Sequence, residues 1–149
     1  MPRIALIKTH LATFQAELYD QETPLTVDHF CRLAQRGFYD NRLIFKVIPR
    51  TLFQTGCPND DGTGSAGVFV PCERDGERQY HDIGVLSMAH TGRNRASSQF
   101  FVCLARRTTE HFDGNHTCFG RIKNNIELLD NFVCGDMIEH IQISSIPDR

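Results

Sequence analysis

The chain of 149 residues has the length of one domain with a single hydrophobic core. Hydrophobic residues make up 40% and charged residues 23%, which is ordinary for a globular protein. The formal net charge of −2 gives no electrostatic reason to expect nucleic acid or an acidic membrane surface as a partner. No apolar run approaches the length of a membrane span, so we expect no membrane association either.

Residues 1–4 lead directly into a strand-like pattern without a secretory signal, so we expect the cytosol or the nucleus. The cysteines are widely spaced and form no Cys-x-x-Cys pair, which argues against a zinc site. Without a secretory context, free thiols are favoured at Cys31, Cys57, Cys72, Cys103, Cys118 and Cys134. The histidines form no His-x-x-x-His pattern, and we expect no metal ion and no other cofactor.

The first predicted elements are two strands with alternating apolar residues, at 4–6 and 14–18, joined near 10–12. A helix is predicted over 24–36, where apolar residues recur at helical spacing. Thr23 is its expected N-cap, Pro24 suits its first turn, and Gly37 is its expected end.

Further short strands and a second helix follow along the chain. A loop is predicted over 59–67, a turn over 112–115, and the second helix over 125–132. Many short strands with two separated helices do not fit alternating βαβ units, but they fit a closed antiparallel barrel with a helix over each open end. The remaining strands are predicted at 43–48, 52–55, 85–89, 100–104, 117–122 and 138–143.

Motifs for several common chemistries are missing. The glycine-rich stretch at 62–67 lacks the Gly-Lys-Ser/Thr ending of a phosphate-binding loop and opens no helix, so a flexible surface loop is favoured. Ser87, Ser97 and Ser98 lack the Gly-x-Ser-x-Gly elbow of an acyl-transfer enzyme. Polar residues among aromatics, such as Lys46 and Gln54, do not by themselves define a site.

Several short segments follow one another in a characteristic order. They are Phe30-Cys31-Arg32-Leu33-Ala34-Gln35-Arg36-Gly37-Phe38-Tyr39-Asp40, Val47-Ile48-Pro49 followed by Gln54, Leu86-Ser87-Met88-Ala89 followed by Gly92 and Asn94, Ser98-Gln99-Phe100-Phe101, Phe112-Asp113-Gly114-Asn115-His116 and Phe119-Gly120-Arg121-Ile122. Together these segments resemble the cyclophilins. The resemblance covers nearly the whole chain with similar spacing. It implies one domain over 1–149, a mainly β fold with a closed eight-stranded antiparallel β-barrel capped by two α-helices, and peptidyl-prolyl cis-trans isomerase activity.

The resemblance also implies a site, carried over residue by residue. The catalytic arginine of the family falls on Lys46, with Gln54 beside it. Phe101 would be the floor of the proline pocket, and backbone groups of His90 would hold the peptide. The residues implied to bind substrate are Leu52, Ala89, His90, Thr91, Gln99, Phe101, His111, Phe112 and His116.

Departures from the family pattern bear on activity. Lys46 keeps the positive charge of the arginine but not its planar, two-pronged geometry, so we expect reduced turnover. Thr51 replaces a usual pocket Phe, and His111 stands where some members carry a Trp that contacts cyclosporin, so weak cyclosporin binding is expected. A one-residue shift in this strand would instead bring Phe53 to the pocket. Phe45, Ile44 and Cys57 are further departures.

Three functions stay open from the sequence. The first is an isomerase of reduced activity that acts on Xaa-Pro bonds and assists protein folding. The second is a catalytically weak module that binds proline-containing segments within a larger assembly, which the changes around Lys46 would favour. The third is a scaffold that binds a partner away from the groove, for which the sequence shows no exposed apolar stripe. We expect a monomer whose partners are proline-containing peptides and proteins.

Overall fold

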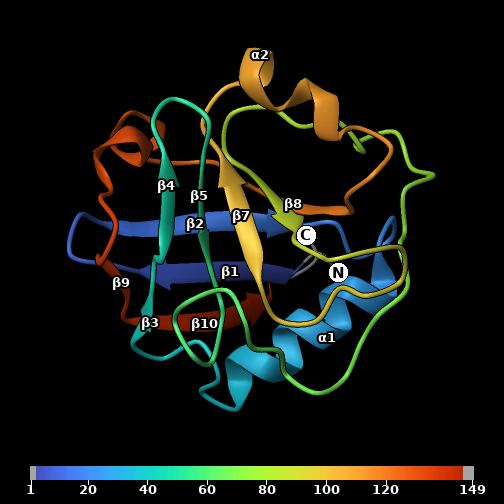
Figure 1. Ribbon diagram of the computed structural model, residues 1–149, viewed down its shortest axis with the longest axis horizontal. Helices are drawn as coiled ribbons and strands as arrows, with labels where there is room; N and C mark the ends of the chain where they lie inside the picture. Colours follow the sequence, from blue (N-terminus) through green and yellow to red (C-terminus); the bar gives the residue numbers. More distant parts are fainter. Residues whose placement is uncertain (1–2, 146–149) are drawn as a thin grey trace.

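The structure, a computed structural model, describes residues 3–145 and is built around one antiparallel sheet. Its eight strands hydrogen-bond in the order β10-β1-β2-β8-β6-β7-β5-β4 (Figure 1). The strand predicted at 52–55 has the predicted bounds, and the others agree within a few residues. The bounds are β1 (Arg3–Lys8), β2 (Thr13–Leu18), β4 (Lys46–Ile48), β5 (Leu52–Thr55), β6 (Val85–Met88), β7 (Phe100–Cys103), β8 (Cys118–Ile122) and β10 (His140–Ser145).

The two edge strands of this sheet, β4 and β10, are brought together by a second ladder. It pairs β3 (Arg42–Leu43), which leads into β4, with β9 (Met137–Ile138), which leads into β10. Hydrogen bonds from Ile44 N to Asp136 O (2.7 Å) and from Gly135 N to Ile44 O (2.9 Å) extend the contact. The sheet therefore closes into a barrel, which confirms the predicted fold class. The runs predicted at 43–48 and 138–143 are each divided into two strands.

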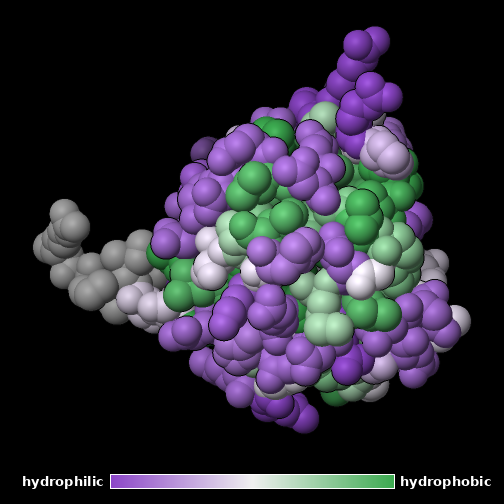
Figure 2. Space-filling model, turned by 90° about the vertical axis from the view of Figure 1, so that its left-hand side faces the viewer, coloured by the Kyte–Doolittle hydropathy of each residue, from purple (hydrophilic) through white to green (hydrophobic). Residues whose placement is uncertain are grey.

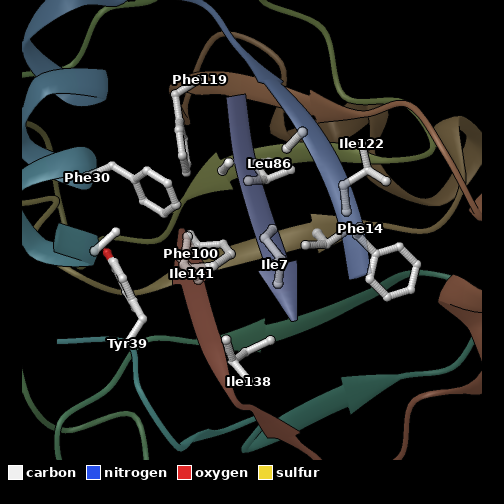
Figure 3. Packing of buried hydrophobic residues seen from close by; sticks show 14 of the residues in the cluster. Ile7, Phe14, Phe30, Tyr39, Leu86, Phe100, Phe119, Ile122, Ile138 and Ile141 are labelled. Carbon is white, nitrogen blue, oxygen red and sulfur yellow. The ribbon is translucent and has the colours of Figure 1, made fainter. Parts of the chain in front are cut away.

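The barrel interior is filled by one face of each strand (Figure 3). On β1 and β2, Ala5 stands opposite Ala16 and Ile7 opposite Phe14, and these side chains are all buried. Because side chains alternate along a strand, the residues between them face outward. The inward pair on β1 is therefore Ala5 and Ile7, although the spacing of Ile4 and Leu6 first indicated the strand.

One opening of the barrel is covered by α1 (Pro24–Gln35), close to the helix predicted at 24–36. Thr23 occupies the N-cap position as predicted, but its hydroxyl donates to the carbonyl of Tyr19 (3.1 Å) and caps nothing. The carboxylate of Glu73 instead accepts hydrogen bonds from Leu25 N (3.2 Å) and Thr26 N (2.7 Å). A residue from a distant loop thus satisfies the free N–H groups of the first helical turn.

The other opening is covered by a 3-10 helix, η2 (Ile126–Asn131). The prediction of an α-helix at 125–132 is therefore wrong in helix type. Asn125, at its N-cap, lies in the left-handed region (φ 52°), and its side chain makes no capping hydrogen bond. Leu129 is buried, and the ring of Phe132 packs 4.8 Å from that of Phe53 and 5.8 Å from that of Phe14. The segment caps the core in spite of its different geometry.

Two short helical turns after β7 were not predicted. They are α2 (Arg106–Thr109) and η1 (Glu110–Phe112), and their sequence has no apolar repeat at helical spacing. In the part of the chain that the structure describes, no helix is long and apolar enough to cross a membrane. The cysteines at the positions predicted to be free thiols form no disulfide, as expected.

Apolar surface is exposed on the face formed by β4, β9 and η2 (Figure 2). Ile48, Val133 and Met137 expose 40%, 62% and 37% of their surface. These residues come from separate segments, which is why the sequence shows no stripe here. Exposed apolar surface is typical of contact regions, so this face favours the scaffold alternative more than the sequence does.

The packing of α1 on the barrel gives a first testable prediction. Phe30 is buried, with its ring centroid 5.0 Å from that of Phe119 and 5.5 Å from that of Phe100. We expect Phe30→Ala to lower the free energy of unfolding by about 3–5 kcal/mol, because it removes this contact and leaves a cavity. Urea unfolding measures the loss. Leu25→Ala on the same helix is the control, since Leu25 is 54% exposed, and equal losses in the two variants would contradict the packing.

Candidate active site

A row of side chains crosses four neighbouring strands on the outer face of the sheet. Lys46 on β4 stands opposite Gln54 on β5, which stands opposite Phe101 on β7, which stands opposite Ser87 on β6. Directly opposed residues project to the same side of a sheet. Phe53 lies on the other side and packs in the core against Phe132. This register excludes the alternative in which Phe53 lines the pocket, and it agrees with the predicted neighbours Lys46 and Gln54.

An aromatic cup lies at the Phe101 end of this row. The ring centroid of Phe101 is 5.2 Å from that of Phe112 and 5.5 Å from that of His116, and those of Phe112 and His116 are 5.2 Å apart. Leu52 and Ala89 belong to the same apolar cluster as Phe101. Phe101 is buried, whereas Phe112 and His116 are half-buried and form the walls. Such a cup can accept a small apolar ring.

His111 lies beside Phe112 at the rim of the cup. Its ring centroid lies 4.0 Å from that of Phe112, and its side chain is exposed. Thr51, between β4 and β5, is half-buried and donates its hydroxyl to the carbonyl of Pro49 (3.3 Å). With an imidazole at this place, the rim offers less apolar surface than a larger aromatic side chain would.

A glutamine pair connects the row to the loop at 57–64. The amide of Gln54 donates to the side-chain oxygen of Gln99 (3.0 Å). The amide of Gln99 donates in turn to the carbonyls of Gly62 (3.0 Å) and Gly64 (2.8 Å). The N–H of Gly64 donates to the sulfur of Cys57 (3.2 Å). The predicted surface loop is therefore tied to the site, and its glycine backbone orients both glutamines.

A second, more polar pocket of about 370 Å³ adjoins the cup. It is lined by the predicted residues Gln54, Ala89, His90, Thr91 and Gln99, together with the loop at 62–65. Ser97 and Ser98 line it as well, and so do Phe69 and Arg95. Sequence reasoning did not single out Phe69 and Arg95, because they lie in segments with no regular periodicity.

His90 connects this pocket with the cup. Its ring stacks on that of His116 at 4.2 Å, and its Nε2 lies 2.8 Å from the carbonyl oxygen of Asn115. Within residues 3–145, the backbone N–H and C=O of His90 make no hydrogen bond, whereas the neighbouring Ala89 N donates to Gln99 O (3.0 Å). The backbone at His90 can therefore pair with an extended peptide that lies in the groove.

A buried histidine supports the floor of the cup, and sequence reasoning missed it. His81 is fully buried, and its ring stacks on that of Phe101 with centroids 5.8 Å apart. Its Nδ1 lies 2.8 Å from a carboxylate oxygen of Asp113, and its Nε2 lies 2.8 Å from the hydroxyl of Ser87. Because a carboxylate only accepts, Nδ1 carries the proton and Nε2 accepts from Ser87. Arg106 also bonds Asp113 and completes the network.

This network has the residue types of a hydrolase triad but not the exposure. Ser87 is fully buried beneath the cup, so it cannot reach a substrate as a nucleophile. Burial lowers the pKa of His81, although the carboxylate of Asp113 acts in the opposite direction. Burial also lowers the pKa of His116, whose Nδ1 donates to the carbonyl of Met88 (2.9 Å). Both imidazoles are therefore neutral at pH 7.

The arrangement offers a cation, a pair of amides, an apolar cup and free backbone groups. In the described part of the chain, no group of three or more His, Cys, Asp or Glu side chains could hold a metal ion. Lys46 is exposed on β4, and no hydrogen bond or ion pair holds its ammonium group within residues 3–145. The geometry suits the binding and polarisation of a peptide that carries a small ring.

Comparisons with known proteins place the chain in a family. Residues 4–146 match the family described as cyclophilin type peptidyl-prolyl cis-trans isomerase/CLD. The peptidyl-prolyl cis-trans isomerase B of Bacillus subtilis is 39% identical over 127 residues, which cover 85% of this chain and 87% of that protein. A peptidyl-prolyl cis-trans isomerase of Synechococcus elongatus is 38% identical over 141 residues, covering 93% and 94%.

A solved structure agrees with the sequence matches. The crystal structure of a cyclophilin type peptidyl-prolyl cis-trans isomerase of Cryptosporidium parvum superposes with a TM-score of 0.89 at 26% identity, covering 99% of this chain and 100% of that one. The barrel, the cup and these relatives define a rotamase of prolyl peptide bonds. The chain belongs to the cyclophilin family and is a peptidyl-prolyl cis-trans isomerase.

The buried histidine gives a second testable prediction. As the pH falls below about 6.5, the unfolded chain takes up a proton at this position that folded His81 resists, so the free energy of unfolding should decline. His81→Gln has no imidazole at this position. Its free energy of unfolding should therefore decline less steeply between pH 7.5 and pH 5.5 than that of the wild type. Urea unfolding across this range measures both slopes.

The control for this measurement is Leu25→Ala, which changes an exposed side chain that does not titrate. It should keep the wild-type pH dependence. An unchanged slope in His81→Gln would contradict the inference that His81 is held neutral in the folded protein.

Proposed function

We propose that this groove catalyses the cis-trans isomerisation of Xaa-Pro bonds with Lys46 as the catalytic cation and the aromatic cup as the proline pocket. The observation that carries the proposal is the row Lys46, Gln54 and Phe101, which sets the cation beside the cup. A second crystal structure of the Cryptosporidium parvum isomerase, in the presence of the dipeptide Ala-Pro, superposes with a TM-score of 0.85 at 25% identity. It supports a proline peptide as the occupant of this groove.

The chemistry needs only a well-placed hydrogen-bond donor. Rotation about the Xaa-Pro bond is slow because the twisted amide loses conjugation, at a barrier of about 18–20 kcal/mol. In the twisted state the proline nitrogen regains a lone pair. A cation aimed at this nitrogen binds the twisted form better than either planar isomer, so it lowers the barrier. No covalent intermediate forms.

Each part of the groove has a task in this proposal. Phe101, Phe112, His116 and Leu52 hold the proline ring, and the neutral His116 adds no charge to the pocket. The backbone of His90 pairs with the peptide. Gln54, oriented by Gln99, positions the substrate and the ammonium group.

The lysine sets the proposed level of activity. An ammonium group is a compact, strongly hydrated charge on a flexible stem, whereas arginine presents a planar fork. The side chain of Lys46 is exposed. It must lose rotational freedom when substrate binds, and this loss costs conformational entropy. We expect turnover about ten- to thousandfold below that of an arginine-bearing groove, or roughly 1.4–4 kcal/mol.

Lys46 variants test the catalytic proposal. NMR exchange spectroscopy on an Ala-Pro peptide should show exchange above background for the wild type, a lower rate for Lys46→Ala and a higher rate for Lys46→Arg. Lys123→Ala is the matched control, because Lys123 is exposed after β8 and away from the row, and it should behave as the wild type. A wild-type rate equal to that of Lys46→Arg would refute the weakening by lysine.

The same experiment separates the second candidate function. A module that only binds proline-containing segments within an assembly would show peptide binding in the NMR titration without accelerated exchange. Rescue of exchange by Lys46→Arg would then show that the catalytic cation alone is deficient. The exposed charge of Lys46 and the intact cup are compatible with this candidate.

Weak cyclosporin binding is a further prediction, carried by His111 and Thr51. A bulky apolar ligand gains area on aromatic side chains, and this rim supplies an imidazole and a hydroxyl instead. We expect His111→Trp to strengthen binding by roughly three- to tenfold. Isothermal titration calorimetry measures the change, with His10→Trp as the control at an exposed histidine. A nanomolar dissociation constant for the wild type would overturn the prediction.

The wider role follows from the reaction. Prolyl isomerisation is slow enough to limit folding, so an isomerase of this kind would assist proteins whose folding waits for it. A monomeric state and a location in the cytosol or nucleus stay predictions.

A further inference from the structure

The polar part of the groove has a rim of arginines. Arg95 and His90 line the pocket beside the cup, and none of the residues lining that pocket is acidic. A neighbouring hollow of about 330 Å³ shares His90 and is lined by Arg74 and Arg93, again without an acidic residue. Positive charge therefore gathers on one side of the proline pocket, although the formal net charge of the chain is −2.

These arginines have no carboxylate partner within residues 3–145. The guanidinium of Arg95 lies over the ring of Phe69 at 4.3 Å, which holds it at the wall of the pocket. One nitrogen of Arg74 donates to the carbonyl of Gly114. By contrast, carboxylates hold the guanidinium groups of Arg3, Arg42, Arg78, Arg106 and Arg121.

Carboxylates close to the groove are occupied elsewhere. Asp61 accepts from the backbone N–H of Thr63 at 2.9 Å and from its hydroxyl at 2.6 Å. Glu73 accepts from the backbone and the hydroxyl of Thr26 at the start of α1. Neither of these carboxylates binds the arginine rim, and within residues 3–145 no other carboxylate forms an ion pair with Arg74, Arg93 or Arg95. Their guanidinium groups can therefore pair with a ligand.

The rim lies within reach of a peptide whose proline occupies the cup. The ring centroid of Phe101 is 5.5 Å from that of His116, which is 4.2 Å from that of His90. His90 in turn lines both hollows that carry the arginines. Since an extended chain advances about 3.3 Å per residue, the rim meets side chains about two or three residues from the proline.

We propose that this groove selects substrates with an anionic side chain, a carboxylate or a phosphate, two or three residues from the proline. The inference rests on the proposed isomerase function and adds a substrate class to it. Guanidinium groups bind carboxylates and phosphates through paired, charge-assisted hydrogen bonds. Arg93 and Arg95 are exposed, so each contact contributes modestly, and we expect about a fivefold preference for glutamate over glutamine.

The test is a set of Ala-Pro peptides with Glu, Gln, Lys or phosphoserine placed two or three residues before the proline, or one, two or three residues after it. NMR exchange gives turnover, and chemical-shift titration gives the dissociation constant. We expect Glu to exceed Gln and Gln to exceed Lys on one side of the proline. The preference should shrink in 0.5 M NaCl, because salt screens exposed charges. A gain with phosphoserine alone would assign the site to phosphorylated segments, and a gain with both to acidic segments in general.

Charge reversal provides the second arm. In the double variant Arg93→Glu/Arg95→Glu the ratio of Glu to Gln turnover should fall below one, and Lys peptides should become the better substrates. Arg32→Glu is the control, because Arg32 is exposed on α1 outside both hollows. This single variant changes the net charge by half as much as the double variant does. It should keep the wild-type ratio of Glu to Gln turnover.

The outcomes separate the two proposals. Equal turnover of Glu, phosphoserine, Gln and Lys peptides at every position would overturn the inference and leave the isomerase function standing. If no peptide is turned over, the proposed catalysis fails, and the titration decides the inference alone. Tighter binding of the Glu peptide would then support it, and equal dissociation constants would overturn it.

Discussion

Cross-strand register between β4, β5, β7 and β6 is the constraint on which both the core and the groove depend. It sets Lys46, Gln54 and Phe101 side by side on the outer face. A slip of one residue in β5 would turn Gln54 inward and Phe53 outward. Phe53 packs against Phe132 beneath η2, so the slip would also expose a buried ring and bury an amide. Packing inside the barrel therefore fixes the positions of Lys46, Gln54 and Phe101 on its outer face.

The floor of the cup gains rigidity from a polar network below it. His81 has both ring nitrogens satisfied, by Asp113 and Ser87, and its ring lies flat under Phe101. A buried imidazole with one unsatisfied nitrogen would cost about 1–3 kcal/mol, so the arrangement favours one tautomer and one position. A fixed floor matters here, because catalysis by a positioned donor depends on geometry within fractions of an ångström.

The sequence predicted what has a local or periodic signature. Alternation located the strands, and Pro24 with Gly37 located α1. The resemblance indicated the candidate site residues, whereas only the strand register could show that Phe53 faces the core. Contacts between distant loops had no such signature. Glu73 caps a helix 48 residues away, and Asp113 bonds His81 across 32 residues. Isolated side chains of this kind become a network only when the barrel brings their loops together.

The two proposals give the cations of this groove different effects on the kinetics. In the proposed mechanism Lys46 faces the bond that twists, so its interaction grows in the transition state and affects kcat. The proposed contact of the arginine rim is with a part of the peptide that does not change during rotation, so it would bind substrate and transition state equally and affect KM. The proposed weakness of the lysine lies in kcat. Remote charge on the substrate can compensate in kcat/KM through tighter binding, but this gain no longer raises the rate once the groove is saturated.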